Sequence, residues 1–358
     1  MDKRDGMNYA PQGKPDPVCK PGDFIFAAVG LDHGHIYGMS NGLIEAGATL
    51  KWVYDPDPEK AAAFAKRYPQ VKIAESEQQV LQDPEVQMVA GAAIPALRCD
   101  LGLRVMDHGK DYFTDKAPFT TLEQLERARQ KCAETGLKYA VYYSERLHVE
   151  SAVHAGALIK DGAIGRVLQV IGLGPHRLNA PSRPQWFFEK DQYGGILIDI
   201  GSHQIEQFLY YADCKDAEVV SSRVANYSYK DQYPELEDFG DANLVGDNGA
   251  TNYFRVDWYT PDGLSTWGDG RTLILGTDGY IELRKYVDIG RKMGGDQLYL
   301  VNNEGEFHFS LRGKVGYPFF GQLILDCLNR TENAMTQEHA FKAAELCLIA
   351  QEKAVRIE

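Results

Sequence analysis

Cysteine is scarce in this sequence and never closely spaced. The 358 residues include 6 cysteines, scattered from Cys19 to Cys347, and none belongs to a Cys-x-x-Cys pair. In a chain of this length, that spacing argues against a disulfide framework and against a structural zinc site. We therefore expect a reduced, cytoplasmic protein.

Long apolar runs and an excess of basic charge are also missing. The strongest apolar run, Phe24 to Val29, is as long as one strand, whereas a membrane span needs ~20 residues. The segment before it has no apolar stretch that would suit a signal peptide. Asp and Glu outnumber Lys and Arg by 51 to 38. Because an acidic surface repels phosphate groups, we expect neither a nucleic-acid nor a membrane partner.

The composition is that of a globular protein, with 44% hydrophobic and 25% charged residues, and the length suits two domains. The first half alternates strand and helix patterns. Strands are expected at Phe24–Val29, Thr49–Tyr54, Val86–Ile94, Tyr112–Thr114 and Tyr139–Tyr143. Asp57-Pro58 and Thr121 are expected to begin helices. This alternation predicts a parallel sheet covered by helices on both faces.

The second half has a different pattern. One helix, from Val149 to Lys160, is followed by glycine-punctuated strand patterns as far as Phe309. Thr251 to Thr260 alternates apolar and polar side chains and continues through a Pro-Asp-Gly turn into Leu264 to Trp267, which predicts a hairpin. A last helix is expected to be capped by Thr336. This half therefore predicts a largely antiparallel sheet.

The turn after the first strand is the first candidate site. In a dinucleotide-binding fold this turn carries Gly-x-Gly-x-x-Gly, whose glycines permit the tight turn and let a pyrophosphate approach the helix N-terminus. Gly30 fills the first position, Asp32 and His35 stand at the second and third, and Gly34 is displaced by one residue. A carboxylate repels pyrophosphate, so we expect Asp32 to turn away and cap the helix. The candidate cofactor-binding residues are Gly30, Asp32, His33, Gly34 and His35; the alternative is a plain strand-to-helix turn.

An acidic residue ends the second strand. Asp55 directly follows Thr49–Tyr54, and an acidic side chain at that position can hydrogen-bond the adenosine ribose hydroxyls. It favours NAD over NADP, whose 2′-phosphate it would repel. The cofactor that we expect is therefore NAD.

Two further motifs carry chemistry. Lys116 follows the fourth expected strand, at the sheet edge where α/β proteins bind ligands, and its ammonium group can stabilise a developing alkoxide. The alternative is a solvated surface lysine. Asp199 and His203 stand four residues apart at the start of a helix, after Gly194-Gly195 and an apolar run expected to form a strand. A histidine oriented by a carboxylate is a natural general base, although such a pair can also only cap and buttress a helix.

A metal-dependent hydrolase on a (β/α)₈ barrel is a rival interpretation. Such barrels also begin with two histidines, here His33 and His35, after a buried first strand. The further ligands would be Lys116, His148, His176 and Asp199. Because the strand–helix alternation stops after five strands, we expect no metal site.

The ordered motifs resemble those of the Gfo/Idh/MocA oxidoreductases, the family of glucose–fructose oxidoreductase and inositol dehydrogenase, over nearly the whole chain from Phe24. Asp199-x-Gly201-x-His203 is similar to the end of the family's Gly-Gly-Gly-x-Leu-x-Asp-x-Gly-x-His motif. Arg146-Leu147 resembles its Arg-Phe. Gly162 to Gly165 and Gly276 to Glu282 resemble its Gly-x-Ile-Gly and Gly-Thr-x-Gly-x-Ile-Glu segments.

The resemblance implies the α/β fold class, with an N-terminal Rossmann-type parallel sheet and a C-terminal α+β domain that has a largely antiparallel open sheet. The expected boundaries are an extended arm over 1–22, a dinucleotide-binding domain over 23–146 and a substrate and oligomerisation domain over 147–358. In the family the second sheet often pairs with another subunit. We therefore expect a homo-oligomer, a dimer or a tetramer, with the apolar face of Thr251 to Thr260 as the interface.

The resemblance also implies an activity, namely NAD-dependent hydride transfer from a secondary alcohol of a sugar, sugar acid or cyclic polyol. Lys116 would hydrogen-bond the reacting oxygen, His203 would take the hydroxyl proton, and Asp199 would orient His203. The candidate substrate-binding residues are Arg146, Arg183 and Trp186.

Three positions depart from the family pattern. Asp32 replaces a turn glycine, Glu-Lys-Pro is Asp115-Lys116-Ala117, and Thr-Pro-Asn is Ile94-Pro95-Ala96, where Pro95 stays a candidate cofactor contact. The family's lysine–proline bond is typically cis. Because a cis bond before a non-proline residue costs ~3 kcal/mol, we expect Lys116–Ala117 to be trans. The departures leave two alternatives: a redox-inactive protein that senses sugar or NAD, and a glycosidase or lyase assisted by tightly held NAD.

Overall fold

The computed structural model describes residues 6–357, which form two compact units. The first unit contains residues 7–142 and 316–341. The second unit contains residues 143–315 and the chain from residue 342 onward, together with Gly6. The sequence pattern did not indicate that 316–341 returns to the first unit.

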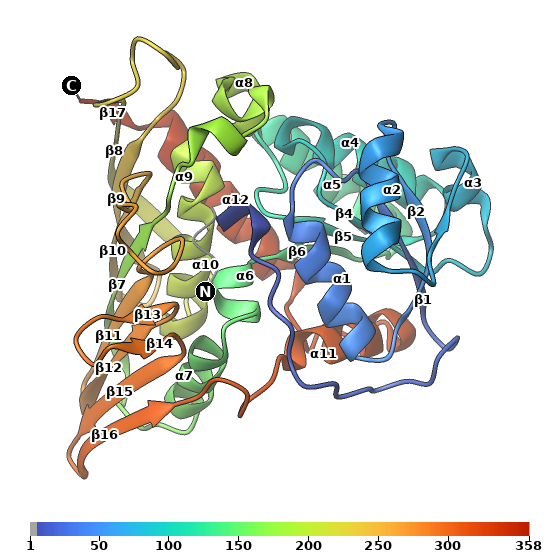
Figure 1. Ribbon diagram of the computed structural model, residues 1–358. Coiled ribbons are helices and arrows are strands. Elements are labelled where there is room, and N and C mark those ends of the chain that lie inside the picture. Colours follow the sequence, from blue (N-terminus) through green and yellow to red (C-terminus); the bar gives the residue numbers. More distant parts are fainter. Residues whose placement is uncertain (1–5, 358) are drawn as a thin grey trace. The chain divides into compact units, whose positions relative to one another are not determined.

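The first unit is built on a six-stranded sheet in which every pair of neighbours is parallel, in the order β3-β2-β1-β4-β5-β6. The strands are β1 Ile25–Val29, β2 Thr49–Tyr54, β3 Lys72–Ile73, β4 Met88–Gly91, β5 Asp111–Asp115 and β6 Tyr139–Tyr142. The helices are α1 His35–Glu45, α2 Pro58–Arg67, α3 Glu77–Gln82, α4 Pro95–Asp107, α5 Leu122–Thr135 and α11 Pro318–Asn329 (Figure 1). This is the strand order of dinucleotide-binding folds, so the predicted Rossmann-type sheet is confirmed.

Helix caps explain why these elements begin where the sequence predicts. Asp57 accepts a hydrogen bond from the backbone N–H of Glu59 at 2.9 Å, and Thr121 accepts one from that of Gln124 at 3.2 Å. These side chains satisfy N–H groups that a helix start leaves without a partner. β3 and α3 were not predicted. A strand of two residues, such as β3, is too short to show the alternation of apolar and polar side chains that identifies strands.

The described segment before β1 begins with a single 3-10 turn, Gly6–Asn8, and then lies along α1. Asn41 Nδ2 donates to the carbonyl oxygen of Pro11 at 3.2 Å, and the backbone N–H of Gly13 donates to Glu45 Oε1 at 3.0 Å. On another side of α1, Gly42 gives room to α11, since a Cβ at that position would lie 2.4 Å from the Phe320 ring.

The second unit is built on a nine-stranded sheet in the order β16-β15-β12-β11-β7-β10-β9-β8-β17. Its strands are β7 Val167–Pro175, β8 Ala217–Ala225, β9 Phe239–Gly246, β10 Thr251–Asp257, β11 Arg271–Gly276, β12 Gly279–Arg284, β15 Gln297–Asn302, β16 Gly305–Ser310 and β17 Val355–Arg356. Only β10 with β7 and β17 with β8 pair in parallel among the described strands of this sheet. β13 Val287–Asp288 and β14 Met293–Gly294 form a separate ribbon. The largely antiparallel open sheet is thus confirmed.

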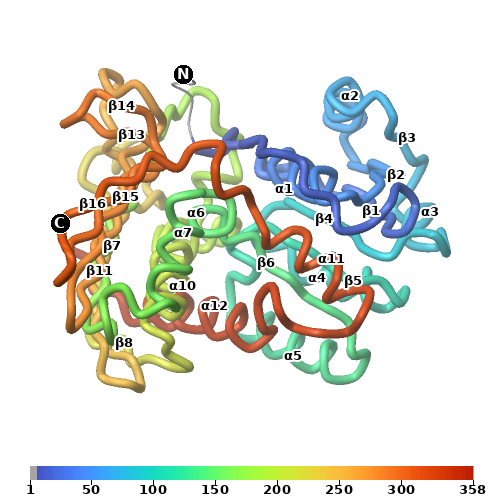
Figure 2. The backbone as a smooth tube through the Cα atoms, turned by 90° about the horizontal axis from the view of Figure 1, so that it is seen from below, coloured from blue at the N-terminus to red at the C-terminus, as the bar shows by residue number. Residues whose placement is uncertain are grey.

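Helices cover one face of this sheet. They are α6 Ser144–Leu147, α7 Glu150–Lys160, α8 Lys190–Tyr193, α9 Ile196–Asp199, α10 Gly201–Ala212 and the second half of α12 Gln337–Glu352. In Figures 1 and 2, α7 and α10 lie along this face, and no helix of the described chain lies on the other face. α12 begins after Thr336, whose Oγ1 accepts the backbone N–H of His339 at 3.1 Å, as predicted.

Two local predictions in the second unit are wrong. No hairpin joins 251–260 to 264–267, because β10 already pairs with β7 on one edge and β9 on the other. The turn beyond it is held instead by Arg177, which donates to the carbonyl oxygens of Pro261 and Leu264 at 2.8 and 3.0 Å. The apolar run after Gly195 is helical rather than extended, because a buried run of this length fits either conformation.

The expected subunit interface on the apolar face of 251–260 is also wrong. Phe254, Val256 and Trp258 are buried inside the second unit. A Cβ on Gly201 of α10 would lie 3.3 Å from the Phe254 ring. This face of β10 is therefore part of the core beneath α10.

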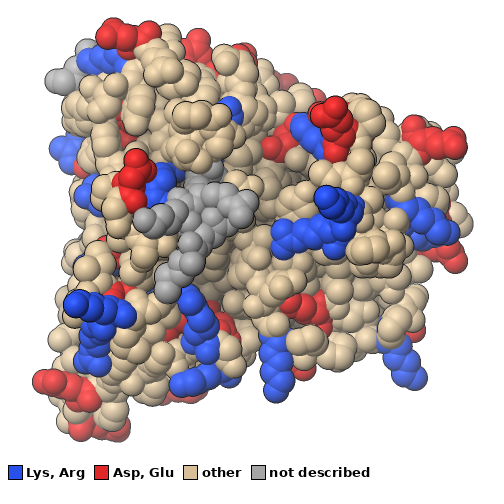
Figure 3. Space-filling model, in the orientation of Figure 1, with Lys and Arg blue, Asp and Glu red and all other residues tan. Residues whose placement is uncertain are grey.

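The surface shows no one-signed patch on the face seen in Figure 3, where acidic and basic side chains are interspersed. Among residues 6–357, no helix combines the length and the apolar character that crossing a membrane requires.

Candidate active site

The turn after β1 has the tight geometry that its first glycine predicts. Gly30 has a φ of +73°, and a Cβ there would lie 3.0 Å from that of Ala93. Its backbone N–H donates to the carbonyl oxygen of Tyr54 at 3.2 Å. The turn is thereby held against the ends of β2 and β4, and only glycine fits this position without strain.

Asp55 lies at the end of β2 and is hydrogen-bonded into the same turn. Its carboxylate accepts the backbone N–H of Leu31 at 2.6 Å and that of Asp57 at 2.9 Å. The side chain is buried. An acidic group is therefore fixed beside the Gly30 turn, where the sequence predicts the ribose contact.

Asp32 turns away from the start of α1, as expected, but it does not cap the helix. Its carboxylate lies 2.5 Å from Lys60 Nζ and accepts the backbone N–H of Ile94 at 3.2 Å. The ammonium group of Lys60, on α2, binds this carboxylate more strongly than the backbone N–H groups at the start of α1 would, because it carries a full opposite charge. His33 takes the capping role, since its Nδ1 accepts the backbone N–H of His35, the first residue of α1, at 3.2 Å.

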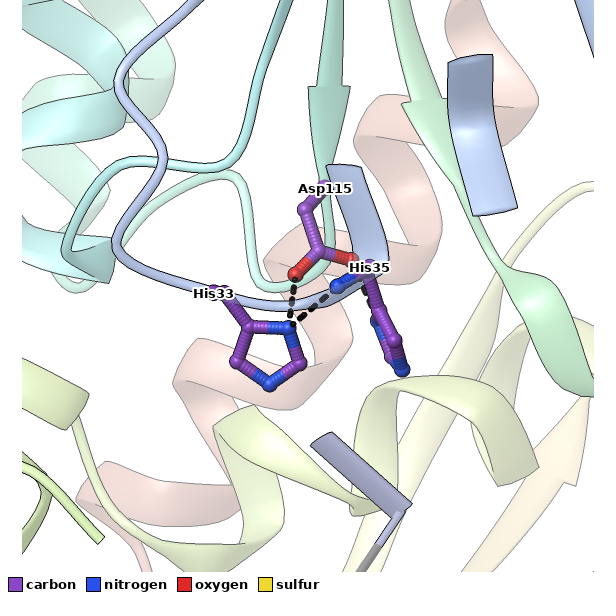
Figure 4. Close-up of side chains that lie close together, drawn as sticks. All are labelled: His33, His35 and Asp115. Atoms are coloured by element: carbon purple, nitrogen blue, oxygen red, sulfur yellow. Dashed lines mark hydrogen bonds and ion pairs between the residues drawn. The ribbon is translucent and has the colours of Figure 1, made fainter. Parts of the chain in front are cut away.

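His33, His35 and Asp115 form a buried cluster between this turn and the end of β5 (Figure 4). His35 Nδ1 lies 2.9 Å from Asp115 Oδ1, and His33 Nδ1 lies 3.2 Å from Asp115 Oδ2. The other ring nitrogen of His33 points away from Asp115 in Figure 4. His35 thus fills with an imidazole the space that the third glycine of the motif would leave.

The charges in this cluster are set by burial and by close partners. Burial lowers the pKa of His33 well below its usual value, and the neighbouring His35 charge acts in the same direction, although Asp115 opposes both. Burial alone would raise the pKa of Asp115, but His35, Arg98 and His33 outweigh it and hold that pKa well below the usual range. Asp115 is therefore ionised and His33 neutral near neutral pH.

Arg98 completes the cluster and was missed in the sequence analysis. Its guanidinium group donates to Asp115 Oδ2 at 3.1 Å, to the carbonyl oxygen of Ala93 at 2.7 Å and to that of Ala117 at 3.1 Å. The side chain is only 1% exposed. A signal was present, because Arg98 falls on the same helical stripe as Leu101 and Val105, which is the buried stripe of α4.

Lys116 lies in the loop after β5 and Pro95 at the start of α4, beside the backbone groups to which Arg98 donates. Both are buried, with Pro95 as the first residue of α4. The Lys116–Ala117 peptide bond is cis, so the expected trans bond is wrong. Arg98 donates to the carbonyl oxygens of Lys116 and Ala117, that is to this peptide group and to the one that follows it.

The three ligating groups of this cluster are close enough to hold a metal ion, with all ligand atoms within 4.8 Å of one another. Each atom, however, already has a protein partner: His33 Nδ1 has the His35 N–H, His35 Nδ1 has Asp115, and Asp115 Oδ2 has Arg98. A guanidinium group beside the carboxylate also repels a cation. The two open sheets, moreover, are no (β/α)₈ barrel.

The predicted acid–base pair lies in the second unit. Asp199 ends α9, and His203 lies in the first turn of α10; both side chains are buried. The Asp199 carbonyl oxygen accepts the hydroxyl of Ser202 at 2.8 Å, which stabilises the junction of the two helices. The structure thus places both residues on one short segment, where α9 meets α10.

The three predicted substrate-binding residues lie in the second unit as well. Arg146 on α6 forms a buried ion pair with Glu206, its Nε 2.7 Å from Oε1, and its guanidinium group lies 3.8 Å from the Tyr210 ring centroid. Arg183 donates to the carbonyl oxygen of Leu178 at 2.9 Å and lies over the Phe187 ring. Trp186 is half-buried. The substrate role of all three stays a prediction.

Two family models match the chain. Residues 28–143 match the oxidoreductase family with an NAD-binding Rossmann fold, and residues 153–282 match the GFO/IDH/MocA C-terminal domain. The chain belongs to the Gfo/Idh/MocA oxidoreductase family. The resemblance seen in its motifs is therefore confirmed.

Similar proteins are known from sequence and structure. The scyllo-inositol 2-dehydrogenase (NAD(+)) of Bacillus subtilis (strain 168) is 27% identical over 257 residues, which cover 71% of this chain and 72% of the relative. A crystal structure of a protein assigned to the oxidoreductases, from Erwinia carotovora atroseptica SCRI1043, is 53% identical with a TM-score of 0.91, over 94% of this chain and 100% of that one. Levoglucosan dehydrogenase in complex with NADH and L-sorbose shares the fold, with a TM-score of 0.74 at 17% identity, over 94% and 98% of the two chains.

Proposed function

We propose that the protein is an NAD-dependent dehydrogenase that oxidises a secondary alcohol of a sugar, a sugar acid or a cyclic polyol. The observation that carries this proposal is the buried Asp55 carboxylate, hydrogen-bonded into the Gly30 turn at the end of β2. Family membership supports it, and relatives named for scyllo-inositol, D-xylose and levoglucosan indicate the substrate class.

The residues of the first unit fit a dinucleotide. The Gly30 turn lies at the central β1–β4 pair of the sheet, and the carboxylate of Asp55 beside it would accept hydrogen bonds from ribose hydroxyls. His33, Gly34 and His35 lie at the N-terminus of α1, where the helix dipole favours a pyrophosphate. NAD bound there would supply the hydride acceptor.

The chain's own residues supply the proton chemistry in this proposal. His203 accepts the proton of the substrate hydroxyl as its carbon loses hydride, and Asp199 orients the imidazole. Lys116 donates a hydrogen bond to the same oxygen and stabilises the negative charge that develops there. Arg146, Arg183 and Trp186 contact the remaining hydroxyls of the substrate.

A substrate screen tests this function. The purified chain is incubated with NAD or NADP and a panel of sugars, sugar acids and polyols that includes scyllo-inositol, D-xylose and levoglucosan, and absorbance at the reduced-nicotinamide band is followed. Reduction of NAD by at least one compound is expected. NAD binding without reduction by any compound would favour the redox-inactive sensor. NAD retained through gel filtration, with glycoside cleavage and no net reduction, would favour the glycosidase or lyase.

Replacing Asp55 by asparagine is expected to weaken the preference for NAD. The variant loses charge-assisted hydrogen bonds to the ribose, so KM for NAD should rise about 10- to 100-fold. KM for NADP should change far less or fall, because the repulsion of its 2′-phosphate is also removed.

Steady-state kinetics with both cofactors measures this change. Asp57→Asn is the matched control, since Asp57 is an exposed capping carboxylate two residues further along. It should leave the ratio of the two KM values unaltered. An unchanged ratio in Asp55→Asn would remove Asp55 from the cofactor site.

We also propose that the chain forms a homo-oligomer through the uncovered face of its nine-stranded sheet. Leu273 and Leu275 of β11 and Tyr280 of β12 are exposed there, whereas Ile274 between the two leucines is fully buried. Exposed apolar rows of this kind mark protein–protein contacts. Sedimentation velocity should give a dimer or tetramer that Leu273→Lys with Leu275→Lys dissociates, and a parent chain that sediments as a monomer would contradict the proposal.

A further inference from the structure

A buried carboxylate–lysine pair lies in the second unit beside the helix that carries His203. Glu145 on α6 and Lys285, which follows β12, are 2% and 1% exposed. Lys285 Nζ donates to Glu145 Oε2 at 2.9 Å, and Gln204 Nε2 of α10 donates to the same oxygen at 3.1 Å. No motif in the sequence had singled out either member of the pair.

Hydrogen bonds connect this pair to His203 itself. Lys285 Nζ also donates to Gln207 Oε1 at 2.6 Å, and Gln207 Nε2 donates to the carbonyl oxygen of His203 at 2.7 Å. The chain of contacts that begins at Glu145 thus ends on the backbone of His203, so a change at Glu145 can reach the first turn of α10.

The sheet leaves room for this network. A Cβ at Gly172 of β7 would lie 2.3 Å from Gln204 Oε1, and one at Gly174 would lie 2.8 Å from Gln204 Nε2. Two glycines on one strand therefore admit a buried amide that serves the Glu145 carboxylate. The arrangement is built by α6, α10 and β7 together.

The charges of the network favour an ionised Glu145. Burial alone would raise the pKa of Glu145, but Lys285, His203 and His176 outweigh it and hold that pKa well below the usual range. Glu145 Oε1 has no hydrogen-bond partner among the described residues and lies 3.9 Å from Nε2 of His176. Nδ1 of that imidazole donates to the carbonyl oxygen of Gly174 at 3.1 Å.

Other charged groups on the surrounding elements do not cancel the negative charge of the Glu145 carboxylate. Arg146 of α6 and Glu206 of α10 neutralise each other in their own ion pair. Asp199 of α9 is a second acidic residue on the segment that holds His203. A buried anion is costly unless its partners compensate it, and here two of those partners are imidazoles.

We propose that Glu145 is a positioning residue for His203. Its ionised carboxylate, held by Lys285, keeps the first turn of α10 in place and favours the protonated imidazole. That is the state which His203 reaches when it accepts the substrate's hydroxyl proton, so the anion stabilises the product of proton transfer. The catalytic consequence rests on the proposed dehydrogenase function, whereas the coupling of Glu145 to His203 does not.

Histidine titration in the cofactor-free full-length chain tests the coupling. The chain has 9 histidines, so selective ¹⁵N-histidine labelling gives a tractable NMR spectrum, in which His203→Asn identifies the His203 signals. In Glu145→Gln the His203 titration midpoint should fall by about one pH unit, because a nearby anion that favours the imidazolium is lost. Glu145→Asp keeps the charge and should leave the midpoint within about 0.3 unit of the parent.

A second buried carboxylate, that of Glu150, provides the control for this titration. Glu150 accepts the backbone N–H of Val315 at 2.9 Å and serves a loop, so Glu150→Gln should leave the His203 midpoint unchanged. An unchanged midpoint in folded Glu145→Gln, or an equal shift in Glu150→Gln, overturns the proposal. If Glu145→Gln does not fold, Lys285→Gln is used. Lys285→Gln leaves the Glu145 carboxylate without its ammonium partner and should raise the His203 midpoint. An unchanged midpoint in this variant overturns the proposal.

Steady-state kinetics with a substrate that the protein oxidises then tests the role of Glu145 separately from the proposed dehydrogenase function. In Glu145→Gln, kcat should fall about tenfold with little change in KM, and the acid limb of the kcat/KM profile should move to lower pH, because the imidazole becomes a weaker base. A shifted NMR midpoint in a chain that oxidises no substrate would leave the coupling intact and contradict the dehydrogenase. Substrate oxidation with an unshifted His203 midpoint would support the dehydrogenase and contradict the coupling of Glu145 to His203.

Discussion

Replacing His203 by asparagine is expected to lower kcat for sugar or polyol oxidation by about 10³-fold. Positioned general bases contribute 10²–10⁴-fold to such reactions, and asparagine keeps polarity and approximate size but cannot accept the proton. KM should change little, because the lost interaction forms only as the proton moves. The measurement is the steady-state rate of NAD reduction with the best substrate of the screen.

The control for this substitution is another histidine of the second unit. His154 on α7 is half-buried and packs against Phe309, with ring centroids 5.3 Å apart. His154→Asn should retain kcat within about twofold, since it loses packing and no catalytic group. If His203→Asn retained the parent's kcat, the general base would have to be another residue.

The second large effect is expected for stability. Replacing Arg98 by methionine should reduce the free energy of unfolding by about 3–5 kcal/mol, the usual cost of removing one partner from a buried ion pair. Asp115 would keep its charge in an apolar environment, and the carbonyl oxygens of Ala93, Lys116 and Ala117 would lose their donor. Denaturant unfolding followed by circular dichroism measures the change.

Arg104→Met on the same helix is the matched control. Arg104 pairs with Glu77 at the surface, with about half of its side chain exposed, and its loss should cost less than about 1 kcal/mol. A similar small cost for Arg98→Met would show that the Asp115 cluster does not depend on the guanidinium group.

The cost of losing Arg98 should depend on pH, and the sign follows from Asp115. A carboxyl group whose pKa is depressed in the folded chain contributes stability above its unfolded pKa, ~3.9, and that stability is lost as pH falls through the folded value. The partners of Asp115 depress its pKa. In Arg98→Met the depression is smaller, so the gap between parent and variant should be full at neutral pH and narrow below about pH 4.

Most of the fold was predictable because its signals are local. The buried β1 and the Asp57 and Thr121 caps follow from residue type and period. β3 and the pairing of β10 with β7 were not predictable, since strand pairing across the chain leaves no trace in either segment. The buried run that opens Ile196–Asp199 predicts a strand although it is helical, because three consecutive apolar residues satisfy both conformations.

The candidate site was predictable only where a motif carries it. Gly30 and Asp55 lie in the same turn, where the Rossmann pattern predicts them, and their role in cofactor binding stays a prediction. Arg98 and Glu145 belong to no motif and act through buried ion pairs formed with partners from other elements. A charged residue on a buried helical stripe was the available signal for Arg98. No comparable sequence pattern indicates Glu145.

The return of 316–341 to the first unit has a consequence for synthesis on the ribosome. Phe319 and Phe320 of α11 contact Phe113 of β5, with ring centroids 6.0 and 6.3 Å apart, and Gly42 of α1 faces Phe320. A nascent chain that has emerged only through residue 142 carries all six strands of the parallel sheet but lacks this aromatic cover. Chaperones would therefore meet an uncovered apolar flank on the dinucleotide fold until more than 170 further residues have left the exit tunnel.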